Sequence, residues 1–236
     1  MNPIIAAAKL HLNKREFTML VPLYCTALAA VLSALVSFLF LRAGSVPGSD
    51  AWVDSSRANP AMLWALAGYL GYLGVQSVAT TFPFALTLGA TRKSFTAGTL
   101  LWMLLMSAYL TAVLAVLAFI EVKTGHWFSG FYIFDVNLLG AGDLSRLIPT
   151  VFLATLTLLS AGGVFAAAWV RYGSLGPVVL ASGIGIVLII AAIILVPSAA
   201  EIFAGFRLGW LAIAALAVIA MSSVGTWLHL RPAIVR

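Results

Sequence analysis

Four polar side chains recur at helical spacing within the otherwise apolar segment 61–87. At about 100° per residue, Tyr69, Tyr72, Gln76 and Thr80 share one helix face within an arc of about 80°. Hydroxyl and amide groups aligned in this way can hydrogen-bond a bound or passing molecule. We therefore expect the stripe to line a dimer interface or a substrate path. The alternative is a structural hydrogen-bond seam between helices.

The opposite face of the same segment carries small residues. Ala67, Gly71, Gly74 and Val78 fall within an arc of about 60° there. Small side chains let two helix backbones approach closely in a membrane. We expect this face to pack against another helix.

No catalytic or metal-binding constellation is recognisable in the sequence. The three histidines, His11, His126 and His229, fall at or outside the ends of apolar runs and have no metal-ligand spacing. The chain also lacks a Gly-x-x-x-x-Gly-Lys-Ser/Thr phosphate loop, a Gly-x-Ser-x-Gly elbow and a His-Glu-x-x-His pair. We expect no catalytic residue, no metal site, no cofactor and no enzymatic activity in this chain.

The composition is that of an integral membrane protein. Of 236 residues, 63% are hydrophobic and 8% are charged, and the mean hydropathy is +1.10. Soluble domains carry roughly a quarter charged residues. The net charge of +6 comes from cations scattered along the chain, so it does not indicate nucleic-acid binding.

Six uncharged runs are long enough to cross a bilayer, which needs about 20 helical residues. The sequence therefore predicts an all-α polytopic membrane protein with a six-helix transmembrane domain over residues 17–230. None of these runs alternates in polarity over about 10 residues as the strands of a β-barrel would. The predicted spans are 17–41, 61–87, 94–120, 147–170, 174–196 and 208–228.

The positions of the charges predict the orientation. With a cytoplasmic N-terminus, the inside segments hold eight cations and one acid, and the outside segments hold five cations and six acids. Lys and Arg accumulate in cytoplasmic loops. We therefore expect a multi-pass protein of the cell inner membrane with both termini, including the tail 231–236, in the cytoplasm.

A separate helix is predicted ahead of the first span, within residues 1–16. Asn2 can cap it and Pro3 suits its first turn. Ile4, Ala8 and Leu12 fall four residues apart, which favours an elbow helix lying in the cytoplasmic membrane interface. A frayed tail is the alternative.

The turn between the second and third spans has a distinctive sequence. Pro83 is expected to bend or end the preceding helix, and a short polar stretch follows before the third span. That stretch consists of Gly89, Thr91, Arg92, Lys93 and Phe95, with Ala90 and Ser94 interleaved.

The span layout and this stretch resemble the membrane subunits of bacterial ATP-binding-cassette exporters of the ABC-2-like class. The resemblance implies that two permeases pair, and that the segment from about 84 to 95 acts as a coupling helix on a cytosolic ATPase. It implies that Gly89, Thr91, Arg92, Lys93 and Phe95 contact this ATPase, which would bind ATP and Mg²⁺. Without the resemblance, Arg92 and Lys93 indicate only that this turn lies on the cytoplasmic side of the membrane.

The outside loop 121–146 departs from that family, whose members often carry re-entrant helices between the fifth and sixth spans instead. The loop is rich in aromatic residues, which indicates anchoring at the membrane interface or a lid over the exit of a path. These residues are Trp127, Phe128, Phe131, Tyr132 and Phe134.

Taken together, the sequence predicts the permease subunit of an ABC exporter, forming a dimeric substrate path. Its partners would be the ATPase, a second or related permease and membrane lipids, without nucleic acid. The uncharged stripe favours apolar or amphipathic cargo over ions. The alternatives are a non-transporting scaffold or sensor of an ATPase complex and a membrane-embedded enzyme with an unrecognised site.

Overall fold

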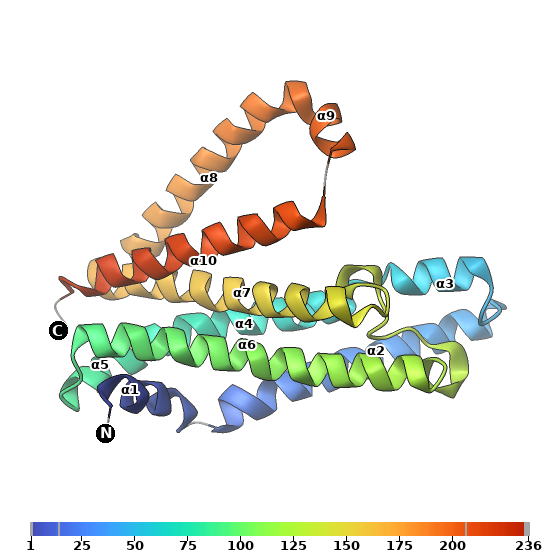
Figure 1. Cartoon of the computed structure of the whole chain (residues 1–236), viewed down its shortest axis with the longest axis horizontal. Coiled ribbons are helices and arrows are strands. Elements are labelled where there is room, and N and C mark those ends of the chain that lie inside the picture. Colours follow the sequence, from blue (N-terminus) through green and yellow to red (C-terminus); the bar gives the residue numbers. More distant parts are fainter. Residues whose placement is uncertain (1, 14, 206, 234–236) are drawn as a thin grey trace.

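The computed structural model describes residues 2–13, 15–205 and 207–233. Throughout these ranges the ordered elements are helices, as predicted. The long helices run roughly along the long axis of the molecule, except α8, which projects away from it (Figure 1). These are α2 (Val21–Arg42), α4 (Ala61–Ala79), α6 (Arg92–Lys123), α7 (Leu144–Tyr172), α8 (Leu175–Leu195) and α10 (Leu208–Leu230).

Shorter helices connect the long ones at the two ends. The helices at the end that holds the chain's N-terminus are α1 (Pro3–Leu12) and α5 (Thr81–Thr87), and a π-helical turn over Glu16–Leu20 leads into α2. Helix α3 (Asp50–Arg57) lies at the opposite end, and α9 (Ala199–Ala204) lies beyond the tip of α8, away from the other helices (Figure 1).

Five helices in the described ranges are long and apolar enough to cross a membrane, which marks the chain as a membrane protein. They correspond to five of the six predicted spans. These segments are Glu16–Arg42, Arg92–Lys123, Leu144–Tyr172, Leu175–Ile202 and Gly209–Leu230.

The predicted span 61–87 is not one continuous helix, which corrects the sequence prediction. It breaks at Thr80 into α4 and α5. The cause is Pro83, whose ring clashes with the carbonyl four residues earlier, at Ala79, and which has no N–H to donate to it. At the break, the Thr80 hydroxyl donates to the Gln76 carbonyl oxygen at 2.8 Å.

The core centres on the contact between α4 and α7, and here the predicted small-residue face is confirmed. A Cβ atom added to Gly74 would lie 2.3 Å from the carbonyl oxygen of Leu159, and one added to Gly162 would lie 2.3 Å from that of Gly71. Such backbone proximity is possible only without side chains at these positions.

Helix α1 forms as predicted, with the Asn2 side chain accepting a 3.0 Å hydrogen bond from the amide of Ile4. The face that it buries within the chain is made by Ala7, Ala8 and His11, while Ile4 and Leu12 are half-buried. This face packs across α6, where a Cβ atom on Gly98 would lie 2.6 Å from that of Ala7.

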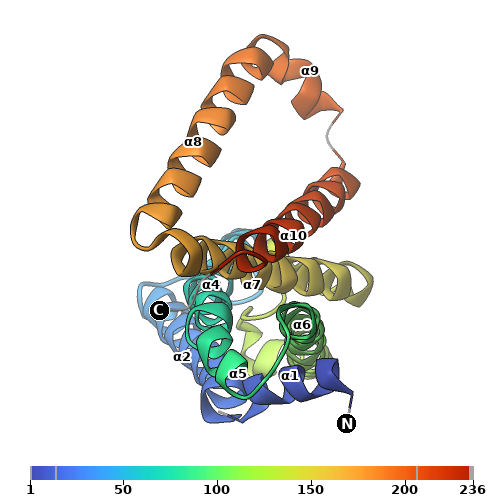
Figure 2. The same ribbon diagram turned by 90° about the vertical axis from the view of Figure 1, so that its left-hand side faces the viewer.

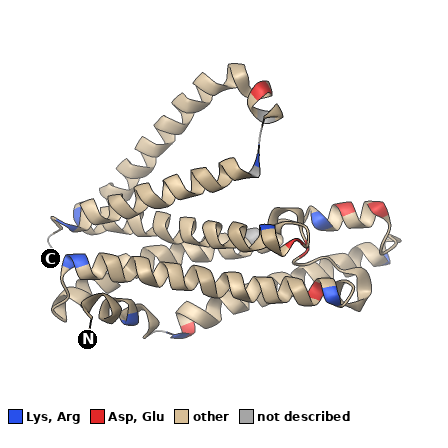
Figure 3. Ribbon diagram, viewed as in Figure 1, with Lys and Arg blue, Asp and Glu red and all other residues tan. Residues whose placement is uncertain are grey.

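Helices α8 and α9 leave the bundle, and α10 returns to it along α7 (Figures 1 and 2). Across the most apolar stretch of α8, no residue is buried within the chain. The charged residues gather towards the two ends of the long helices and leave their middle portions uncharged (Figure 3).

Candidate functional site

A cavity of about 430 Å³ opens beside α1, near the break between α4 and α5. Three of the four residues of the predicted stripe line it. Tyr72, Gln76 and Thr80 are in its wall, whereas Tyr69 is not. The remaining lining residues are Leu10, His11, Asn13, Phe17, Thr18, Leu73, Ser77, Thr81, Phe84 and Trp102.

The residues of the stripe make two kinds of hydrogen bond: Tyr69 bonds to another helix, whereas Tyr72 and Gln76 bond to each other. The Tyr69 hydroxyl donates to the carbonyl oxygen of Phe17, so this residue joins α4 to the start of α2 as a seam would. Gln76 donates from Nε2 to the Tyr72 hydroxyl at 3.0 Å, within α4 itself. Tyr72 is 50% exposed. The C-terminal part of the stripe, from Tyr72 to Thr80, therefore faces the cavity.

His11 and Trp102 are two buried residues of the cavity lining, and the sequence did not indicate either as part of a site. Their rings stack at 4.8 Å between centroids with 28° between planes. His11 Nε2 lies 3.0 Å from the Thr99 hydroxyl. Because His11 is buried, its pKa falls to about 4, so the imidazole is neutral at pH 7.

Trp102 carries an unsatisfied donor. It is 2% exposed, and no acceptor among the described residues lies within hydrogen-bond distance of its Nε1–H. A buried donor without a partner costs roughly 1–3 kcal/mol.

The lining is polar but uncharged. Among its described residues there is no Asp, Glu, Lys or Arg, and the one titratable imidazole, His11, is neutral. The cavity thus combines hydroxyl, amide and indole groups with apolar side chains such as Phe17 and Leu73. This chemistry suits an uncharged ligand.

The turn between α5 and α6 has some residues that face outward and others that contact the rest of the chain. Gly89 has a φ of +80°, which makes the turn possible. Thr91 caps α6 by accepting from the amide of Ser94 at 3.1 Å. Gly89, Thr91 and Lys93 are exposed, and so is the neighbouring Leu88.

Arg92 and Phe95 make internal contacts in this turn. Arg92 donates to the carbonyl oxygens of Arg231 at 2.6 Å and Ala233 at 2.7 Å, beyond the end of α10. Phe95 has no exposed surface and packs edge-on against Phe82, with 5.1 Å between ring centroids. The outward face of the turn is therefore made by the other three predicted residues and Leu88.

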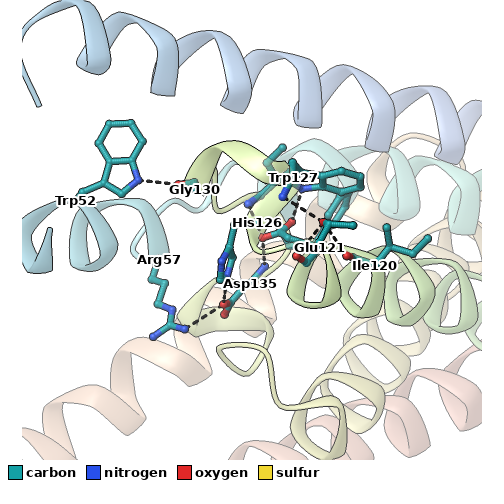
Figure 4. Close-up of polar contacts among 11 residues, drawn as sticks. Trp52, Arg57, Ile120, Glu121, His126, Trp127, Gly130 and Asp135 are labelled. Atoms are coloured by element: carbon teal, nitrogen blue, oxygen red, sulfur yellow. Dashed lines mark hydrogen bonds and ion pairs between the residues drawn. The ribbon is translucent and has the colours of Figure 1, made fainter. Parts of the chain in front are cut away.

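At the far end, the loop after α6 folds back over Glu121 (Figure 4). Glu121 has no exposed surface. Its carboxylate accepts hydrogen bonds of 2.8–3.0 Å from the Trp127 indole and from three consecutive backbone amides. These amides belong to Ile133, Phe134 and Asp135.

A second buried acid, Asp135, joins this loop to α3. Its Oδ2 atom lies 3.0 Å from Arg57 and 2.8 Å from His126 Nε2 (Figure 4). The hydrogen bond to Asp135 raises the pKa of Arg57. The ring of Tyr132 stacks on His126 at 3.9 Å and lies under Arg57 at 5.3 Å.

The aromatic residues of the loop consequently differ in their surroundings. Phe134 is buried in the core, whereas Phe128 is 87% exposed. The loop is held closed by its own carboxylates, a role that the sequence did not indicate. Nowhere in the described residues do three His, Cys, Asp or Glu side chains gather as a metal site would require.

Comparisons with protein-family models, with curated proteins and with solved structures found no match to this chain.

Proposed function

We propose that the chain is the membrane-spanning permease subunit of an ATP-driven exporter of uncharged amphipathic molecules. The observation that carries the proposal is the inner cavity, where Tyr72, Gln76 and Thr80 meet the neutral His11–Trp102 wall. Pockets of this size with a few polar groups on an apolar surface are typical of small-molecule sites.

In this proposal α4 is the sixth membrane-crossing helix, and α1 lies in the cytoplasmic interface of the inner membrane. In support, α1, the α5–α6 turn and the C-terminal end of α10 lie at the same end of the bundle (Figure 1). This end carries Lys9, Arg92, Lys93, Arg171 and Arg231, as the positive-inside rule requires of a cytoplasmic end.

The energy for transport would come from a cytosolic ATPase subunit, because the sequence has no phosphate-binding loop. Helix α5 and the exposed residues Leu88, Gly89, Thr91 and Lys93 would form its docking surface. A second permease copy or a related permease would complete the path. ATP-driven closure of two such ATPases would then open it to the outside by rigid-body motion.

Affinity purification of the full chain in a mild detergent tests the docking surface. We expect an ATPase with a phosphate-binding loop to co-purify with the wild-type chain. Lys93→Glu reverses the charge on the outward face of the turn and should reduce ATPase recovery several-fold. Lys123→Glu is the matched control, because Lys123 is exposed at the opposite end of the same helix. Absence of any ATPase from the wild-type sample would overturn the exporter proposal.

Replacement of both Tyr72 and Gln76 by Leu tests the path. The double variant removes the two polar side chains of α4 that hydrogen-bond each other in the cavity wall, while keeping apolar bulk. We expect loss of export with unchanged recovery of the ATPase. Unchanged export would exclude this face of α4 from the path.

A further inference from the structure

We infer that a second cavity binds an uncharged amphipathic molecule with a head of several hydroxyl groups, such as a sugar, and a hydrocarbon tail. This cavity, which we call the outer cavity, has a volume of about 630 Å³. It lies among the C-terminal half of α2, the loop 43–49, α3 and the start of α4. The inference rests on the lining of this cavity and on α2 as a membrane span, and not on the proposed exporter function.

Two helical faces that carry serine residues enclose the outer cavity. In each of them the lining residues follow the spacing i, i+3, i+4 and i+7, which places them on one side of a helix. The two sets are Ser33, Val36, Ser37 and Phe40 on α2, and Trp52, Ser55, Ser56 and Asn59 on α3 and the turn that follows it. The same faces that bound the cavity therefore supply its polar groups.

Four hydroxyl groups in the lining are free to bind a ligand. They belong to Ser37, Ser45, Ser56 and Tyr132, and none of them forms a hydrogen bond with another described residue. Ser45 is exposed and the other three residues are half-buried, so a ligand can reach them. Each hydroxyl offers one donor and two acceptor lone pairs. This lining suits a ligand that also carries several hydroxyl groups.

The wall of the outer cavity is held in place by hydrogen bonds within the chain. The Asn59 side chain donates from Nδ2 to the Ser33 hydroxyl at 3.1 Å and so joins the two serine-bearing faces. The Trp52 indole donates to the carbonyl oxygen of Gly130 at 2.7 Å, which ties α3 to the loop that supplies Tyr132 (Figure 4). A wall that is already ordered binds its ligand at a lower entropic cost.

The lining favours an uncharged head. Among its described residues there is no Asp, Glu, Lys or Arg. The charged residues of α3, which are Asp50, Asp54 and Arg57, are outside the lining, and Arg57 is paired with Asp135. An ionic head would lose part of its hydration here without gaining a partner, which costs more than the transfer of a hydroxyl group.

The tail of the ligand would lie along α2. Leu32, Val36 and Phe40 line the outer cavity and are exposed, and α2 belongs to a candidate membrane span. From Leu32 to Phe40 the helix rises by about 12 Å. The bilayer side of the outer cavity therefore offers an apolar surface of this length, next to the hydroxyl groups that would hold the head.

Photo-cross-linking of the full chain in lipid nanodiscs tests the inference. The probe is octyl β-D-glucoside with a diazirine in its octyl chain, and the labelled peptides are identified by mass spectrometry. Unlabelled octyl β-D-glucoside and its anionic counterpart, octyl β-D-glucuronide, serve as competitors. We expect cross-links within residues 32–61. The glucoside should compete at a concentration at least about tenfold lower than the glucuronide.

The double variant Ser37→Ala and Ser56→Ala removes two of the free hydroxyl groups. We expect the glucoside concentration needed for competition to rise by about five- to tenfold, the effect of two hydrogen bonds. The melting temperature should stay the same, because neither side chain bonds to another described residue. Ser198→Ala is the matched control, since Ser198 is exposed and is not among the lining residues.

Equal competition by the glucoside and the glucuronide would overturn the inference. Cross-links to the lining of the inner cavity alone would also overturn it, as would unchanged competition in a double variant that is as stable as the wild-type chain. If the double variant does not give a monodisperse protein, the ratio of the two competitors and the positions of the cross-links in the wild-type chain decide the question.

Discussion

The indole nitrogen of Trp127 donates a 2.8 Å hydrogen bond to Glu121, a carboxylate with no exposed surface at the last turns of α6. Within the described chain no cation pairs with Glu121, and four N–H groups satisfy it instead. Hydrogen bonds to an ionised acceptor are roughly twice as strong as neutral ones. The hydrogen bonds of Glu121 therefore hold the loop 124–143 against the end of α6.

Glu121→Gln should destabilise this loop. The amide NH₂ of Gln would face a backbone N–H in place of an acceptor oxygen, and the charge would be lost. We expect the free energy of unfolding to fall by roughly 2–4 kcal/mol, measured by thermal unfolding in detergent. Protease cleavage within 124–143 should become faster. Glu16→Gln, at an exposed acid, should change neither, and an equally stable Glu121→Gln variant would contradict this account of the loop.

Gly74→Ala should disrupt the contact between α4 and α7. The added methyl group would lie 2.3 Å from a backbone oxygen that cannot move independently of its helix. Overpacking of this kind costs about 1–3 kcal/mol or more, measurable as a lowered melting temperature. Gly68→Ala, on the same helix, has open space around its added Cβ. It should be neutral or slightly stabilising, since Ala is the better helix former. Equal melting temperatures for the two variants would argue against the close approach.

The stability of the chain should fall as the pH drops from about 7 towards 4, in part through His11. In the folded state its pKa is lowered to about 4 from 6.5. The unfolded chain therefore binds a proton between these values that the folded chain does not, and stability is lost as pH falls. The full contribution is about 3 kcal/mol. His11→Gln keeps a polar group near Thr99 but does not titrate, so its melting temperature should fall less between pH 7 and 5. An identical pH dependence in both proteins would refute the role of His11.

Arg92→Gln should lower stability, whereas Lys93→Gln should not. Arg92 donates to two carbonyl oxygens at the end of α10, while Lys93 is exposed. Loss of two charge-assisted hydrogen bonds at a partly exposed site should cost about 1–2 kcal/mol. Melting temperatures of the two purified variants make the comparison. A larger loss of stability in Lys93→Gln than in Arg92→Gln would reverse these assignments.

Much of the fold follows from hydropathy alone, because a bilayer imposes a minimum helix length and excludes charge. Five spans and the capped N-terminal helix were predictable for that reason. The Gly71–Gly74 face was predictable from residue size. The break at Thr80 could also be predicted, because the ring of Pro83 clashes with the carbonyl group four residues before it.

The candidate site was only partly predictable. Periodicity placed Tyr72, Gln76 and Thr80 on one face, but Tyr69 is bonded to Phe17, 52 residues earlier in the chain. His11 meets Thr99 across 88 residues, and no local pattern encodes a contact at that separation. Glu121 lay just outside a predicted span, and its burial could not be predicted because its partners are mostly backbone amides, which every sequence contains.

Helix α8 is the most apolar of the five candidate spans in the described residues, and no residue of its most apolar stretch is buried within the chain. Its position in a membrane therefore depends on partition into hydrocarbon, which needs no partner helix. For biogenesis this implies an order of events. During synthesis α8 can leave the translocon as soon as it emerges, independently of whether α2 to α7 have packed. The surrounding lipid, in place of a neighbouring helix of the same chain, would therefore hold the most apolar stretch of α8.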